Sequence, residues 1–273
     1  MIRDITLGQY YPGISFIHRA DPRAKIVFTL LYITSVFVAD SIAAYAAVIL
    51  SAVVLVAVSG ISLPVLLRGV KPLLYVIVFT AVMNIIFTTG KEPLWQFWII
   101  KIYPEGLETA VLMVIRILVL ILGSSVMLTY TTTPIALTDG IEQLLMPLAK
   151  LKLPVHDFAM MMTIALRFIP TLLEETDKIM SAQKARGADF STGSIMERGK
   201  ALIPVMVPLF VSSFRRADEL AVAMECRCYR GGEGRTRMNV LKMRPSDWAL
   251  VLCGFLFIGA LVAVNIFFDT KLF

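Results

Sequence analysis

Charged residues are scarce in this sequence, and their scarcity excludes an ordinary soluble domain. Only 17% of the 273 residues are charged, whereas 58% are hydrophobic and the mean hydropathy is +0.78. Soluble domains carry about 25% charged and about 45–50% apolar residues. The charge that is present collects near the amino terminus and between residues 137 and 247, which leaves long uncharged stretches. The composition therefore predicts an integral membrane protein.

The sequence also lacks the motifs that would let it drive transport or catalysis by itself. A nucleotide-binding loop needs glycines followed by Lys and Ser or Thr, and the glycines at 231, 232 and 234 have no lysine at that spacing. The two histidines, His18 and His156, are too far apart to form the paired ligands of a metalloprotease. No predicted span carries a carboxylate in its interior, as a proton-coupled carrier would require; Glu108 stands at the edge of the fourth. These absences predict a chain without a cofactor of its own that takes its energy from a partner.

Five apolar stretches approach or reach the length of about 20 residues that a helix needs to cross a bilayer. Asp40 separates the first two, so we expect a tight helical hairpin that returns this carboxylate to water. The stretches are residues 22–39, 42–58, 72–88, 107–129 and 248–268. The predicted fold is therefore an all-α integral membrane protein with about five transmembrane helices.

Lysine and arginine gather on one side of these spans. If the amino terminus is cytoplasmic, the outer loops receive only Lys91, Lys101 and Lys271, as the positive-inside rule requires. A basic cluster precedes the last span and consists of Arg230, Arg235, Arg237, Lys242 and Arg244. Membrane lipids with anionic head groups explain this cluster, because no fold that recognises nucleic acid stands beside it. We expect a multi-pass protein of the cell membrane with its amino terminus in the cytoplasm.

The region between the fourth and fifth spans differs from both lipid-crossing and disordered sequence. Apolar residues recur at helical spacing over 158–185 and 201–225, with polar residues on the opposite face. Neither apolar run reaches 18 residues without a charge or a proline, so we place both helices at the membrane interface. The predicted domains are 1–133 with the first four spans, 134–247 with cytoplasmic amphipathic helices, and 248–273 with the last span and tail.

The two amphipathic stretches end alike, with one arginine between small residues. The first ends at Ala185, Arg186 and Gly187, and the second at Cys226, Arg227 and Cys228. Small neighbours let a guanidinium enter a groove on another protein, where its five donors can bind acidic groups. Alternatively, each arginine simply complements the negative carboxyl end of its helix. The residues alone leave both interpretations open.

Cysteine at both sides of Arg227 raises the question of metal binding. Residues two apart on a helix point about 200° apart, so Cys226 and Cys228 cannot share one ion. No second cysteine or histidine pair stands nearby, and we predict small packing residues rather than a metal site.

Arg116 lies about nine residues into the fourth span, where a charge is costly and suggests a function. One arginine without a membrane carboxylate makes no proton relay. We therefore predict a structural role, in which Arg116 donates to carbonyls or polar groups of neighbouring helices, for example Asn84.

Several longer motifs resemble those of a known family. They are Arg-Asp-Ile-Thr-Leu-Gly-Gln-Tyr-Tyr-Pro at 3–12, His-Arg-Ala-Asp-Pro-Arg-Ala-Lys at 18–25, Ala-Leu-Arg-Phe-Ile-Pro-Thr-Leu at 165–172, Ala-Gln-Lys-Ala-Arg-Gly-Ala-Asp at 182–189 and Gly-Glu-Gly-Arg-Thr-Arg at 232–237. Together, in order and along essentially the whole chain, they resemble the T component of energy-coupling factor transporters. The amino-terminal motif is more similar to the shared vitamin-uptake branch than to the cobalt or nickel branch.

The resemblance implies a scaffold between other subunits. In that family the two arginine triplets end coupling helices that dock into two cytoplasmic ABC-type ATPase subunits, A and A′, so Arg186 and Arg227 would be the docking arginines. ATP and Mg would be bound by those partners, and the substrate by a separate membrane S component, one of several that can be interchangeable. Cys228 departs from the family pattern, because it replaces a glycine that tolerates left-handed geometry.

The alternative function is a polytopic membrane enzyme that acts on a lipid or prenyl substrate. Such an enzyme would need clustered acidic residues at the cytoplasmic interface. Glu174, Glu175 and Asp177 come nearest, but their spacing favours the solvated face of a helix.

Overall fold

A computed structural model describes residues 10–90, 95–97, 100–151, 154–190, 192, 194–231 and 240–267. The chain divides into two compact units. Gly8–Ile141 and Leu241–Phe273 form the first, here called the bundle unit, and Glu142–Val240 belongs to the second, the arm unit. The predicted motif at 3–9 and the basic residues Arg235 and Arg237 lie outside the described residues.

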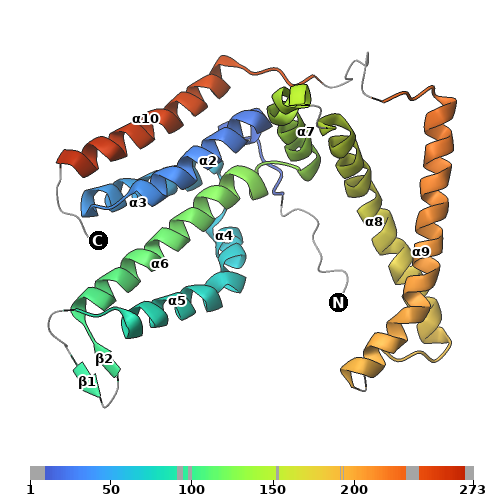
Figure 1. Cartoon of the computed structure of the whole chain (residues 1–273), viewed down its shortest axis with the longest axis horizontal. Helices are drawn as coiled ribbons and strands as arrows, with labels where there is room; N and C mark the ends of the chain where they lie inside the picture. Colours follow the sequence, from blue (N-terminus) through green and yellow to red (C-terminus); the bar gives the residue numbers. More distant parts are fainter. Residues whose placement is uncertain are drawn as a thin grey trace. The chain divides into compact units, whose positions relative to one another are not determined.

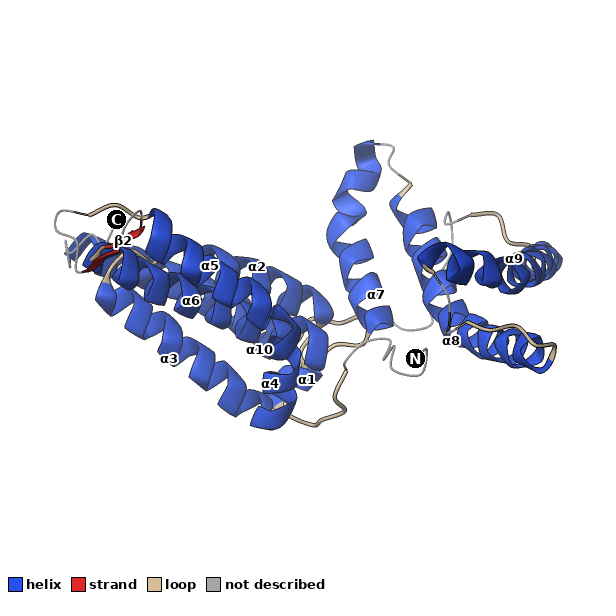
Figure 2. Ribbon diagram, turned by 90° about the horizontal axis from the view of Figure 1, so that it is seen from below, coloured by secondary structure: helices blue, strands red, loops and turns tan. Residues whose placement is uncertain are grey.

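The bundle unit is built mainly of helices that run side by side (Figures 1 and 2). Helix α10 packs against α2, α5 packs against α6, and α6 also contacts α2 and α3. The elements are α1 (Phe16–Arg19), α2 (Pro22–Val38), α3 (Ile42–Ser59), α4 (Leu63–Val70), the 3₁₀ turn η2 (Lys71–Leu73), α5 (Leu74–Phe87), β1 (Trp95–Phe97), β2 (Ile100–Ile102), α6 (Pro104–Ser124), the π-helical turn η3 (Ser125–Tyr130), α7 (Pro134–Leu145), which crosses into the arm unit, and α10 (Pro245–Phe267).

Local capping explains where the first helices begin. The Asp21 side chain accepts from the backbone N–H of Arg23, and Pro22 takes the first helical position, which needs no donor. The Ser41 hydroxyl caps α3 by accepting from Ala44. The chain therefore turns sharply at Asp40, which is exposed, as the predicted hairpin requires.

Four apolar segments among the described residues are long enough to cross a membrane. They are Ile42–Ser59, Leu63–Phe87, Pro104–Tyr130 and Pro245–Phe267. The predicted first span corresponds to α2, whose 17 residues make it shorter than each of these four. In the structure, α4 precedes the predicted third span and the two form one apolar segment, Leu63–Phe87. Pro72 does not interrupt this segment, because it falls in the first turn of η2, where a missing N–H costs little. The all-α membrane fold is confirmed, with four such segments and α2 beside them.

The bundle core is small and lies between α2, α3 and α6. Val36, Val48, Val126 and Met127 are almost fully buried there, together with Leu261 from α10. Many other apolar side chains of the bundle helices α3, α5 and α10 are exposed, including Leu50, Phe79, Phe87, Phe255 and Leu256. Apolar outer faces of this kind suit contact with lipid tails.

The arm unit consists of the short turn η4 (Met146–Leu151) and two long helices. Helix α8 (Val155–Ala185) has 31 residues and α9 (Ile195–Cys226) has 32, so each extends about 46–48 Å at 1.5 Å per residue. They pack against each other and cross in Figure 1. Both begin earlier than the amphipathic pattern predicted. At α9, Ser194 and Glu197 form a reciprocal capping box, which sets the start of the helix before the amphipathic pattern begins.

The predicted boundaries at 133 and 247 follow the ends of the predicted spans, whereas this division follows packing within the chain. The cytoplasmic location of 134–247 stays a prediction.

Candidate functional site

The carboxyl end of α8 is closed by a Schellman motif. The N–H of Gly187 donates to the carbonyl of Lys184 at 3.0 Å, and the N–H of Ala188 donates to the carbonyl of Gln183 at 3.0 Å. This pattern requires a left-handed residue directly after the cap, and Gly187 has φ 89°. Arg186 is therefore the cap residue itself, the last one before the chain reverses.

The carboxyl end of α9 has the same hydrogen bonds. The N–H of Cys228 donates to Glu225 at 2.8 Å, and that of Tyr229 donates to Met224 at 3.0 Å. Cys228 takes the left-handed position with φ 57°, and Arg227 is the cap residue. The cysteine thus adopts the geometry of the missing glycine, at a cost of about 1–2 kcal/mol for a residue with a Cβ.

The two ends consequently present their arginines in the same way. Arg186 has φ −86° and ψ 6°, and Arg227 has φ −91° and ψ 14°. All six predicted docking residues are exposed to solvent: Ala185, Arg186, Gly187, Cys226, Arg227 and Cys228. Two equivalent guanidinium groups at two helix ends can each donate to acidic groups of a partner.

Helices α8 and α9 are linked where they cross. Arg216 Nη2 of α9 donates to Glu175 Oε2 of α8 at 2.9 Å. A second, longer bond of 3.5 Å runs from Gln183 Nε2 to the carbonyl of Pro204. That carbonyl needs an outside donor, because Pro208 has no N–H to give it. Of these two pairs, the one that lies later in α8 lies earlier in α9, since Glu175 pairs with Arg216 and Gln183 with Pro204. The two helices are therefore antiparallel.

The ion pair lies midway between the two arginines along the helices. Eleven residues separate Glu175 from Arg186, and eleven separate Arg216 from Arg227. The helix segment between the ion pair and each arginine therefore measures about 16 Å at 1.5 Å per residue. Because the helices are antiparallel, the two arginines lie on opposite sides of the crossing. Two helix segments of equal length thus run in opposite directions from the ion pair, and the bond of Gln183 to Pro204 is a second link along one of them.

Sequence reasoning missed this link. Glu174 and Asp177 are exposed, as expected for a solvated face, but Glu175 is half-buried and paired with Arg216. A contact between residues 41 positions apart leaves no local pattern. The acidic cluster that a membrane enzyme would need is thus partly engaged in packing.

Arg116 of α6 reaches the turn between α2 and α3. Its Nη2 donates to the carbonyl of Ala39 at 3.0 Å, and its guanidinium carbon lies 5.5 Å from the centroid of the Tyr45 ring. The Asn84 amide, named as an example partner, donates to Thr80 on its own helix. The structural role of Arg116 stays a prediction, supported by this carbonyl contact at the negative end of α2.

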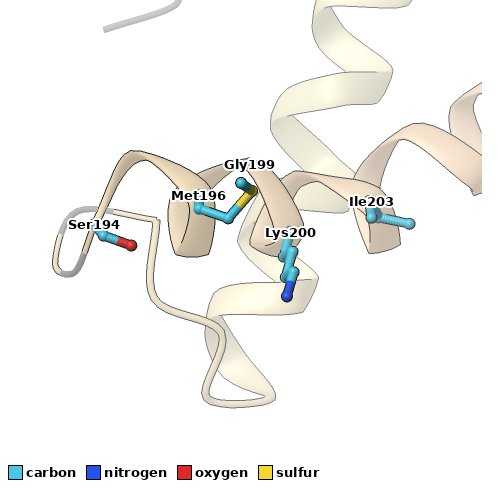
Figure 3. Close-up of a pocket in the computed structure, with 5 residues that line it drawn as sticks. All are labelled: Ser194, Met196, Gly199, Lys200 and Ile203. Atoms are coloured by element: carbon cyan, nitrogen blue, oxygen red, sulfur yellow. The ribbon is translucent and has the colours of Figure 1, made fainter.

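No group of three or more potential metal ligands occurs among the residues that the structure describes. Cys226, Cys228 and Cys253 are free and exposed. An open hollow at the start of α9 is lined by Ser194, Met196, Gly199, Lys200 and Ile203 (Figure 3). In Figure 3 the side chains of Met196, Lys200 and Ile203 leave α9 in different directions, and Ser194 stands before the helix, so the hollow offers no built binding site.

Comparison with known proteins agrees with this architecture. Residues 13–239 match the model of a family described as cobalt transport protein. The chain is 52% identical over 254 residues to the energy-coupling factor transporter transmembrane protein of Clostridium kluyveri, with 93% of this chain and 94% of the relative covered. The proteins of the same name from Acidaminococcus fermentans and Bacillus subtilis are 55% and 46% identical; the alignments cover 90% and 92% of this chain and 91% and 95% of those relatives.

These matches extend over nearly the full length of the chain and of its relatives, and the apolar helices provide the membrane spans that the relatives' name requires. The chain is a multi-pass membrane protein and belongs to the family of transmembrane components of energy-coupling factor transporters.

Proposed function

We propose that this chain transmits the energy of ATP hydrolysis from two cytoplasmic ABC-type ATPase subunits to a separate membrane subunit that binds a vitamin or another micronutrient. The observation that carries the proposal is the pair of equivalent helix ends, each with an exposed arginine in the same backbone geometry. Two similar ATPases need two similar docking ends, and one continuous scaffold supplies them.

The chemistry of docking follows from the arginines. Arg186 and Arg227 are exposed at helix ends, and their neighbours on both sides are small. A guanidinium can therefore enter an acidic groove without steric hindrance and form paired hydrogen bonds to carboxylates. ATP and Mg belong to the ATPases in this proposal, and the chain contributes position and movement.

The link between α8 and α9 transmits movement of the Arg186 end to the Arg227 end. When the ATPases approach each other on binding ATP, they displace both arginine ends relative to the crossing at Glu175 and Arg216. Because the helix segments on the two sides of the crossing are equal in length, that displacement becomes a change of the crossing angle between α8 and α9. The rotation tilts the substrate-binding subunit and releases its cargo inside the cell.

The arm unit also offers a surface for the substrate-binding subunit. Apolar side chains are exposed along both long helices, including Phe158, Met161, Val207, Phe210, Phe214 and Val222. An apolar surface of this extent is typical of a site for another protein or for lipid. Side chains of Met adapt to different partners, which suits interchangeable substrate-binding subunits.

Co-purification tests the proposal. Wild-type chain expressed with its ATPases should retain both, whereas Arg186→Glu and Arg227→Glu should each lose ATPase, because a carboxylate repels an acidic groove. Arg215→Glu is the matched control, since Arg215 is exposed on α9 and lies away from its end. Wild-type chain that retains no ATPase in mild detergent would contradict the proposal and reopen the membrane-enzyme alternative.

A further inference from the structure

Among the described residues, the chain passes between the bundle unit and the arm unit near Ile141 and near Val240. The outgoing connection follows η3, runs through Thr131 and Thr132 and continues into α7. The returning connection enters at Leu241 and leads to α10. Both connections are hydrogen-bonded, within the bundle unit, to residues 21–25 at the start of α2.

Lys25 holds the outgoing connection. Its side chain is only 1% exposed, and Nζ donates to the carbonyl of Thr131 at 2.8 Å and to Oγ1 of Thr132 at 3.2 Å. Its remaining near contact is the carbonyl of His18 at 3.4 Å. A buried ammonium group is tolerated only where acceptors surround it, so these acceptors fix the position of the connection.

Arg23 and Asp21 hold the returning connection. Arg23 Nη2 donates to the carbonyl of Leu241 at 3.1 Å. The same guanidinium grips the Asp21 carboxylate with two bonds, from Nε at 3.1 Å and from Nη2 at 3.0 Å. Paired bonds of this kind fix orientation as well as distance.

Asp247 joins the start of α10 to the start of α2. It is 2% exposed, and its two oxygens accept from different helix starts: Oδ2 from the N–H of Arg244 at 2.7 Å, and Oδ1 from the N–H of Asp21 at 3.1 Å. One carboxylate therefore caps two helices at once. The returning connection and the first turn of α2 are thus held as one piece.

We infer that residues 21–25 form a clamp which holds both connections to the arm unit and passes movement of the arm helices into the bundle through α2. Asp21, Arg23 and Lys25 are positioning residues in this inference. Helix α2 packs along α10 and against α6, so a pull on either connection displaces the centre of the bundle. The inference rests on the proposed coupling function and adds the point of transmission to it.

The test uses the whole complex in liposomes, with ATP hydrolysis and substrate uptake measured on the same preparation. Arg23→Met removes the link to Leu241. Thr132→Val removes one acceptor of Lys25, and with it the bond from Thr132 to the Met127 carbonyl, with little change of volume. Both variants keep Arg186 and Arg227, so they should retain wild-type amounts of ATPase. Coupling between two sites is typically worth a factor of about 5–150, and we expect about tenfold more ATP hydrolysed per substrate for Arg23→Met.

The matched controls are Arg19→Met and Thr34→Val. Arg19 is exposed on α1, and Thr34 donates only along its own helix to Leu30. Both should keep the wild-type ratio of hydrolysis to uptake. A variant in which uptake and hydrolysis fall together, or a control that uncouples equally, would overturn the inference, because either result indicates a merely structural effect.

Hydrogen exchange of the chain alone separates this inference from the proposed function. Thr132→Val lies in the outgoing connection, yet the clamp requires faster exchange also at residues 241–248 of the returning one, by about tenfold. If exchange rises only near residue 132, the clamp is wrong even where ATPases bind. If exchange rises in both connections but wild-type chain binds no ATPase, the clamp stands and the coupling function falls.

Discussion

The two units of the chain bury their apolar side chains very differently. The bundle unit contains nearly all the buried apolar residues, whereas Ala159 and Val205 are the buried apolar residues among those described in the arm unit. Both units nevertheless expose many apolar side chains. Lipid covers the outside of a bundle that crosses a membrane. The two long helices of the arm unit bury few apolar side chains against each other, so their exposed apolar surface is the part of the molecule that a partner protein or lipid can cover.

The test with the largest expected effect places the same charge in each unit. Val126 is 0% exposed in the bundle core, and Val126→Asp should lower the free energy of unfolding by about 4 kcal/mol, because the carboxylate finds no partner there. Val211 is 54% exposed on α9, and Val211→Asp should change it by less than about 0.5 kcal/mol. Thermal unfolding in detergent measures both. Equal losses would remove the distinction between the units.

A smaller effect is expected at Arg116. Arg116→Leu removes the donor that α6 gives to the Ala39 carbonyl, and the loss should destabilise the bundle by about 2 kcal/mol and reduce assembly and uptake with it. Arg68→Leu is the control, because Arg68 is exposed on α4. Normal assembly and transport by Arg116→Leu would show that the predicted structural role is wrong.

The left-handed residues that follow α8 and α9 can be exchanged to compare the two helix ends directly. Cys228→Gly relieves the left-handed strain and should stabilise the end of α9 by about 1 kcal/mol. Gly187→Cys should cost α8 about the same, purely through the backbone, since a Cβ there would meet no atom within 4 Å. Hydrogen exchange of the last-turn amides reports both. Changes of the same sign at both ends would disprove the equivalence of the two motifs.

The smallest expected effect concerns the crossing. Glu175 and Arg216 are about a third exposed, so the pair should contribute only about 0.5 kcal/mol. Glu175→Arg and Arg216→Glu should each broaden the distribution of distances between spin labels placed at residues 188 and 229. The double exchange should restore the narrow distribution. Glu174→Arg and Arg215→Glu are controls one residue away, both exposed. A double exchange that behaves like the singles would show that the pair does not set the crossing.

How far the sequence predicts this molecule depends on how local each feature is. Membrane spans follow from apolar length, so four of the predicted stretches correspond to apolar segments of the structure, and the arginine ends follow from small residues beside Arg186 and Arg227. Helix α4 escaped prediction, because Arg68 and Lys71 interrupt its apolar pattern. The bonds of Lys25 to Thr131 and of Glu175 to Arg216 join residues 106 and 41 positions apart, and no spacing rule reveals them.

The bond between Asp247 and the amide of Asp21 also constrains how the protein is made. The two residues are 226 positions apart, so this bond can form only after the start of the last helix has been synthesised. The whole intervening chain, arm helices included, is synthesised before then. A chain that ends before residue 247 lacks the bond that joins the start of α2 to the start of α10. This contact is therefore among the last that the bundle can form.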